Sequence, residues 1–292
     1  MAPYVPRVAG IRERQLFFGA PGSGKSNALM SIMRRQADDF FYILDSEDDW
    51  MFSLGEDEAN DELLARGNFD IRVLTDNKDF DQHLETIIKI REKIKPGEFF
   101  FYDKLTPAWQ AAQDWFTNEI FGEDLADYVL EARKALEEKR KAQQKAGGKG
   151  DRTAPVFDQL RDWGPINAQY NKIVREIQKI ATVAHVFIVA DIKNIGENTK
   201  PEKVRLYRPY SGLPAGQGDI DVLPHTIIHF DHDPRAQEYT MSTVKDRGTR
   251  ESKKRMDSVE WVDFSVSYLR DVAGWHAEGE ENGKAKGKGK KK

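Results

Sequence analysis

Residues 15–26 read QLFFGAPGSGKS. The short apolar run at 15–18 leads into eight residues that match the pattern G-x-x-x-x-G-K-[ST] at every defined position. Helix-compatible residues follow from Asn27 to Arg35. This order predicts a strand, a glycine-rich loop and a helix, which is the context that the pattern requires.

The chemistry of this loop suits a polyphosphate. Glycines allow successive backbone N–H groups to face one side as an anion nest, and the start of the following helix adds its positive end. Lys25 would contact the β and γ phosphates of ATP, and the hydroxyl of Ser26 would ligate Mg²⁺. We therefore assign nucleotide binding to Gly19, Ala20, Pro21, Gly22, Ser23, Gly24, Lys25, Ser26 and Asn27.

Strands and helices alternate along most of the chain. Buried strands are expected at 40–44, 71–74, 99–103 and 183–190, and amphipathic helices at 80–94 and 166–181. Two further strands at 226–230 and 238–244 are joined by turn residues, and a last helix is expected at 264–272. Such alternation predicts an α/β fold with a mostly parallel twisted sheet, flanking helices and a C-terminal antiparallel hairpin.

The chain is expected to form one domain with two additions. Residues 1–276 make up the domain, into which a charged helical arm is inserted at about 123–150. Residues 277–292 form a Lys-rich tail that is expected to be disordered. The stretch from 194 to 222 has little periodicity and is expected to be a long functional loop.

Carboxylates follow two of the predicted strands. The strand ends Gly19, Asp45 and Asp103 should lie along one edge of the sheet, where α/β proteins bind ligands. Asp103 ends an apolar strand and is suited to hold Mg²⁺ through water.

Residues 42–47, YILDSE, resemble the corresponding segment of the RecA-like ATPases. In that family this strand ends in D-x-E, and its glutamate polarises the attacking water. The resemblance implies that Glu47, 22 residues beyond Lys25, is the catalytic base. A carboxylate beside the γ phosphate can accept a proton from water, and Asp45 or Asp48 could substitute.

Two further segments resemble the family and depart from it. Residues 102–107, YDKLTP, look like the metal-binding strand, with Lys104 where a small hydroxyl residue is usual. Residues 187–193, FIVADIK, resemble the strand that ends in a polar phosphate sensor, a place taken here by Asp191.

Residues 243–248, TVKDRG, resemble the K-x-R-G strand of RecA-like helicases and recombinases. The resemblance implies that Lys245 and Arg247 reach into the ATP site of a neighbouring subunit, where a cation stabilises charge on the transferring phosphoryl group. The overall layout looks like the RecA-like ATPases of bacteriophages, which are linked to recombination and single-strand annealing.

These resemblances favour an ATP-driven oligomer, a ring or filament, that handles single-stranded DNA. Loops at 104–118 and 194–218 interleave aromatic and basic residues, as single-strand binding requires. A P-loop kinase with lid arginines at 205, 208 and 235 is one alternative. A nucleotide-switched adaptor that uses the 123–150 arm as its partner contact is another.

Composition excludes several other classes. The chain has 292 residues, a net charge of -4 and no cysteine, which excludes disulfides, thiol catalysis and cysteine-ligated zinc. No apolar stretch approaches the roughly 20 residues of a membrane helix, and no secretory signal is visible. A cytoplasmic protein is expected.

Overall fold

The computed structural model describes residues 3–6, 11–122, 163–197, 199–216, 220–247, 256 and 258–277, with scattered positions between 127 and 142. Those scattered positions are helical. The rest of the predicted arm at 123–150, and residues 278–292 of the predicted tail, lie outside the described residues.

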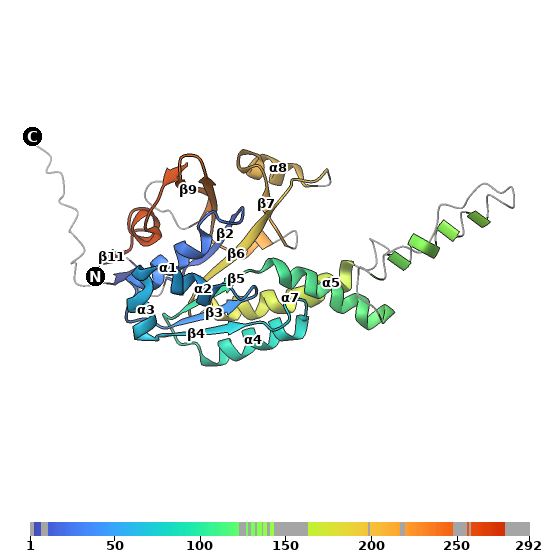
Figure 1. Cartoon of the computed structure of the whole chain (residues 1–292), viewed down its shortest axis with the longest axis horizontal. Coiled ribbons are helices and arrows are strands. Elements are labelled where there is room, and N and C mark those ends of the chain that lie inside the picture. Colours follow the sequence, from blue (N-terminus) through green and yellow to red (C-terminus); the bar gives the residue numbers. More distant parts are fainter. Residues whose placement is uncertain are drawn as a thin grey trace, which may run out of the picture.

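A central sheet organises the chain (Figure 1). Its strands lie in the order β10-β9-β8-β2-β6-β5-β3-β4. Neighbours from β8 to β4 are parallel, whereas β9 and β10 are antiparallel. Their bounds are β2 Arg14–Gly19, β3 Phe41–Asp45, β4 Phe69–Val73, β5 Phe99–Asp103, β6 His185–Lys193, β8 Thr226–Asp233, β9 Glu238–Asp246 and β10 Val259–Glu260.

Three short strands complete the description. β7 (Leu213–Pro214) pairs with the end of β6. β1 (Tyr4–Val5) and β11 (His276–Ala277) form a separate antiparallel pair. The mostly parallel sheet and the antiparallel β8–β9 hairpin confirm the predicted fold class.

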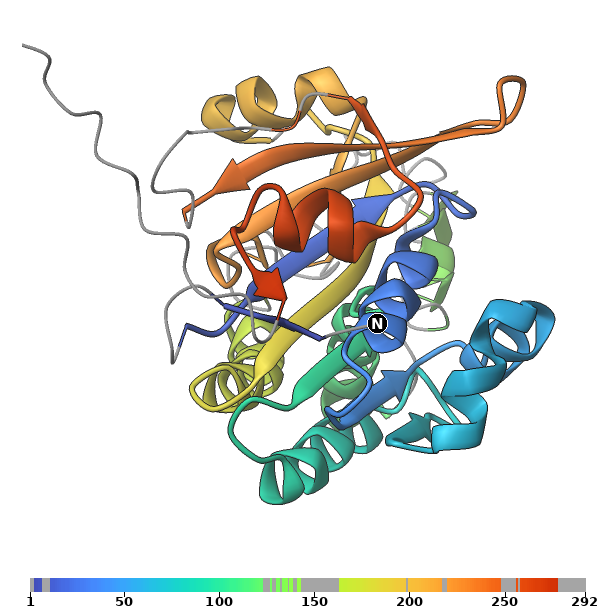
Figure 2. The ribbon, with the colours of Figure 1, turned by 90° about the vertical axis from the view of Figure 1, so that its left-hand side faces the viewer.

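Helices cover both faces of the sheet because consecutive strand residues point to opposite sides (Figures 1 and 2). Phe18, Tyr42 and Tyr102 belong to one apolar core, which includes residues of α4, α5 and α7. Phe17, Phe41 and Phe101 belong to the other, with residues of α1, α2, α3 and a π-helical turn at 265–270. The helix bounds are α1 Lys25–Arg35, α2 Trp50–Glu56, α3 Asp61–Arg66, α4 Phe80–Lys93, α5 Thr106–Phe121, α7 Trp163–Ile180 and α8 Pro201–Tyr207.

The interpretation of 104–118 as a DNA-gripping loop is wrong, because this segment contains most of helix α5. Trp109 stacks on Trp163 with ring centroids 5.6 Å apart, and Trp115 packs on Phe80 at 6.3 Å. Phe116 is also buried. These aromatic side chains stabilise the core beneath the sheet and do not form an open platform for bases.

The described part of the expected loop at 194–222 contains regular structure. It contains α8, two 3-10 turns and β7. Tyr207 is buried and meets Phe18 edge to face at 5.8 Å, which fixes α8 beyond the carboxyl end of the sheet. Among the described residues, none of the helices is both long and apolar enough to span a bilayer.

Candidate functional site

The strand ends named in the sequence lie together at one edge of the sheet. Parallel pairing sets Asp45 opposite Asp103, and Gly19 opposite Asp191. The glycine loop follows β2 and Asp103 ends β5, and a single strand, β6, lies between these two. The prediction that Gly19, Asp45 and Asp103 share an edge is confirmed.

The glycine loop has the backbone that an anion nest needs. Gly22 and Gly24 have φ angles of 75° and 88°, a left-handed conformation that side chains disfavour. A Cβ on Gly19 would lie 2.1 Å from the carbonyl oxygen of Phe230 in the neighbouring strand β8. Helix α1 starts directly after the loop at Lys25, so its positive end faces any bound anion.

Lys25 is held inside this loop. Its ammonium donates hydrogen bonds to the carbonyl oxygens of Gly19 at 3.0 Å and Ala20 at 2.7 Å, and to Ser23 Oγ at 3.3 Å. Burial lowers the pKa of Lys25, and nearby charges act on it as well. Those charges belong to Asp191, Lys104, Asp103 and Glu47.

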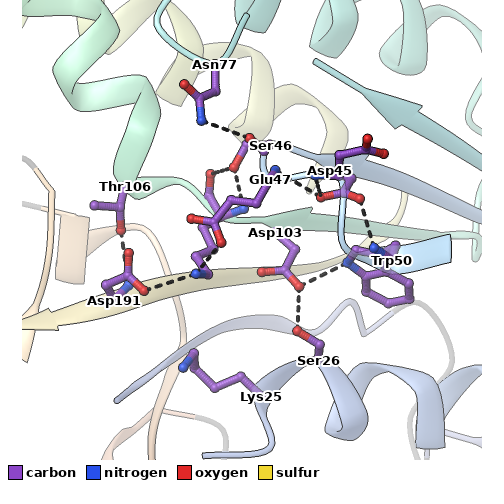
Figure 3. A network of polar contacts seen from close by, with 12 residues as sticks. Lys25, Ser26, Asp45, Ser46, Glu47, Trp50, Asn77, Asp103, Thr106 and Asp191 are labelled. Atoms are coloured by element: carbon purple, nitrogen blue, oxygen red, sulfur yellow. Dashed lines mark hydrogen bonds and ion pairs between the residues drawn. The ribbon is translucent and has the colours of Figure 1, made fainter. Parts of the chain in front are cut away.

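Asp103 and Ser26, the predicted metal ligands, are in contact (Figure 3). Ser26 Oγ donates to Asp103 Oδ2 at 2.7 Å, and Trp50 Nε1 donates to the same oxygen at 3.0 Å. Burial raises the pKa of Asp103 to about 6, against the effect of these two hydrogen bonds. The other carboxylate oxygen, Oδ1, is buried and has no hydrogen-bond partner among the described residues.

This arrangement fits a magnesium ion. The hydroxyl and carboxylate oxygens are hard ligands, and Mg²⁺ is usually held by one or two carboxylates together with substrate phosphates and water. The described residues contain no cluster of three or more His, Cys, Asp or Glu that could hold a metal by itself. The orphaned oxygen of Asp103 is the atom that a cation or its water would satisfy.

Asp45 has a structural task. Its carboxylate accepts hydrogen bonds from the backbone N–H groups of Glu47, Asp48 and Trp50, at 3.1, 3.0 and 3.0 Å. These bonds shape the turn between β3 and α2. Because both of its oxygens are engaged, Asp45 is a poor candidate for the catalytic base.

Lys104 lies between Glu47 and Asp191 and forms an ion pair with each. Its ammonium pairs with Glu47 Oε2 at 2.5 Å and with Asp191 Oδ1 at 3.5 Å. Burial alone would lower the pKa of Lys104, but the hydrogen bond to Glu47 and the charge of Asp191 raise it. Sequence reasoning marked Lys104 and Asp191 as separate departures from the family pattern, and did not foresee that they pair.

Trp50 is a second residue that sequence reasoning missed. It is 2% exposed and follows the acidic run 47–49, yet its indole N–H reaches Asp103. A lone aromatic residue after an acidic turn was the only available signal.

Lys245 and Arg247 lie away from this edge. Asp246, between them, pairs with Thr226 at the start of β8, whereas Gly19 pairs with Phe230 farther along β8. Lys245 Nζ donates to the carbonyl oxygens of Asp221 and Pro224. Their role across a subunit boundary therefore stays a prediction.

Asn27, the last residue assigned to nucleotide binding, lies in the first turn of α1. It is exposed, and its side-chain oxygen accepts a hydrogen bond from Arg34 at 3.3 Å. Contact with a nucleotide is a prediction for this residue.

No protein-family model matches the chain, and no curated protein matches it in sequence. Two solved structures are similar in chain path. A RadB recombinase is 9% identical, with a TM-score of 0.47 over 85% of this chain and 84% of that one. A KaiC-like protein, PH0186 from the hyperthermophilic archaeon Pyrococcus horikoshii OT3, is 11% identical, with a TM-score of 0.42 over 87% of this chain and 94% of its own.

Proposed function

We propose that this protein is a RecA-like ATPase that binds ATP with Mg²⁺ and hydrolyses it. One observation carries the proposal: Ser26 Oγ and Asp103 Oδ2 are 2.7 Å apart, directly after the buried Lys25 of the glycine loop. A loop, an ammonium, a hydroxyl and a buried carboxylate that meet at one sheet edge are the parts that phosphoryl transfer needs.

Each residue has a distinct task in this proposal. Lys25 turns from the loop carbonyls to the terminal phosphates, and the loop amides bind the remaining phosphate oxygens. Ser26 and Asp103 hold Mg²⁺, which neutralises charge on the phosphates when it is bound. Glu47 accepts a proton from the attacking water. Hydrolysis is favoured over transfer to a metabolite because Glu47, in the D-S-E segment at the end of β3, is a carboxylate that can accept a proton from water.

We extend the proposal to assembly and to DNA. Lys200, Arg205 and Arg208 are exposed on and beside α8, beyond the carboxyl end of the sheet, whereas Tyr207 is buried. This surface suits contacts to phosphates more than stacking on bases. Arg247 is exposed and available to a neighbouring subunit. Recombination or annealing on single-stranded DNA, as in the bacteriophage proteins that the motifs resemble, is the proposed setting.

The test is the ATPase rate of the full chain with and without single-stranded DNA, with the molecular mass measured in the same samples. We expect turnover that rises with DNA and with assembly. Phosphate transfer to a small molecule would instead identify a kinase. Tight ATP binding without turnover would identify a nucleotide-switched adaptor.

A further inference from the structure

The cation at the end of β5 has a position that the proposed ATPase chemistry does not yet use. Lys104 is 18% exposed and lies between Glu47, which is 33% exposed, and Asp191, which is 30% exposed. Glu47 follows β3, and Asp191 is the first half-buried residue of β6. These two strands lie on either side of β5. One ammonium therefore links the candidate base to a neighbouring strand.

Lys104 belongs to the same charge cluster as the phosphate loop. Asp191 pairs with Gly19, the first residue of the loop, in the β2–β6 register. The charges of Lys104, Glu47 and Asp191 all act on the ammonium of Lys25. A phosphate group that draws Lys25 out of the loop would thus meet a second cation that two carboxylates already hold.

The backbone of Lys104 is fixed by hydrogen bonds that do not involve its side chain. Ser46 Oγ accepts from Lys104 N–H at 2.9 Å and donates to its carbonyl oxygen at 3.0 Å. The N–H of Ser46 also donates to the carbonyl oxygen of Asp103 at 2.7 Å. The ammonium can therefore change partners by side-chain rotation alone, without movement of β5.

We propose that Lys104 distinguishes triphosphates from diphosphates by changing partners at this site. Without a γ phosphate the ammonium of Lys104 bridges Glu47 and Asp191, and the charge of Glu47 is held in an ion pair. The γ phosphate carries more negative charge than either carboxylate, so it takes the ammonium and leaves Glu47 free to act on water. A diphosphate lacks that group and leaves the ion pairs in place. This inference rests on the proposed ATP binding.

The experiment compares affinities for ADP and for the imido analogue AMP-PNP, each with Mg²⁺, by calorimetry. Lys104→Gln should weaken AMP-PNP binding by about tenfold or more, as the loss of a charge-assisted hydrogen bond implies, and leave ADP affinity within about twofold. Asp191→Asn should raise the affinity for AMP-PNP relative to that for ADP, because it removes a carboxylate that competes for the ammonium. Lys104→Arg should keep most of the discrimination.

Lys89→Gln is the matched control, because it removes a lysine whose ion pair with Glu85 is exposed on α4. It should leave both affinities unchanged. Equal losses for both nucleotides in Lys104→Gln, or no change in either, would overturn the inference. Should that variant fail to fold, an unchanged ratio in Asp191→Asn would overturn it equally. If wild-type protein bound neither nucleotide, the ATPase proposal itself would fail, which is a different result.

Discussion

Ser26 Oγ donates a hydrogen bond to Asp103 Oδ2 across 77 positions of sequence. The contact joins the first turn of α1 to the end of β5. Strand β6 lies between β5 and β2, the strand that precedes α1. The contact brings together the two residues that the sequence assigned to the metal from separate motifs.

Lys25→Ala should abolish nucleotide binding, because it removes the ammonium that the loop holds for the phosphates. Calorimetry with ADP and with AMP-PNP measures the affinity. Lys89→Gln, an exposed lysine on α4, serves as the control. Intact affinity in Lys25→Ala would mean that the loop is not the phosphate site.

Glu47→Gln should bind ATP and fail to turn it over, because an amide cannot accept the proton of water. Phosphate release measures the rate, and calorimetry measures the affinity. Asp48→Asn is the matched comparison, since it changes the next carboxylate of the same turn. If Asp48→Asn lost turnover while Glu47→Gln kept it, the base would be Asp48.

Arg247→Ala should impair turnover only in the assembled protein. Its position at the far end of β9 keeps it from the glycine loop of its own chain. A cation supplied across an interface is worth about 10³ to 10⁵ in rate where it operates. The measurement is the ATPase rate across a dilution series. The same loss in dilute monomer would refute the role.

Trp50→Phe should lower the free energy of unfolding by about 2 kcal/mol, because it removes a hydrogen bond to a buried carboxylate. The ring is 2% exposed, so the substitution also leaves unfilled space. Urea denaturation of both proteins measures the difference. A change below about 0.5 kcal/mol, the range of ordinary surface substitutions, would show that the indole N–H contributes little to holding Asp103.

His185 should make stability depend on pH. Burial, with the charge of Arg12, lowers its pKa to about 3, and its Nδ1 accepts the N–H of Glu13 at 3.1 Å. The unfolded chain binds this proton below about pH 6.5 and the folded chain does not. The stability that the uncharged His185 contributes to the folded protein is therefore present above about pH 6.5, and it is lost as the pH falls toward 3.

Between pH 7 and pH 5 the free energy of unfolding should fall by about 2 kcal/mol because of His185. Urea denaturation at both values, in wild type and in His185→Gln, isolates this loss. The wild-type protein should lose about that much more stability than the variant. An equal loss in both proteins would assign the acid sensitivity to other groups.

The sequence predicted β2, β3 and β5 well because each is a mostly apolar run that ends in glycine or a carboxylate. The sequence could not predict the ion pairs of Lys104, because both partners are distant along the chain. Glu47 lies 57 positions earlier, and Asp191 lies in a much later strand. Sequence reasoning misjudged Trp109 and Trp115, because aromatic residues near basic ones suggest a binding loop when their packing partners in α4 and α7 are unknown. Spacing identifies which strand ends meet, whereas side-chain partners depend on contacts between distant segments.

Strand β2 lies between β6 and β8, and both of these neighbours come from the later half of the chain. A ribosome therefore releases the glycine loop long before it releases the strands that flank it. The loop cannot take its place at the sheet edge until residues up to about Phe230 have emerged, because that carbonyl packs against Gly19. Nascent chains shorter than this should not retain nucleotide, and the capacity should appear late and all at once during synthesis.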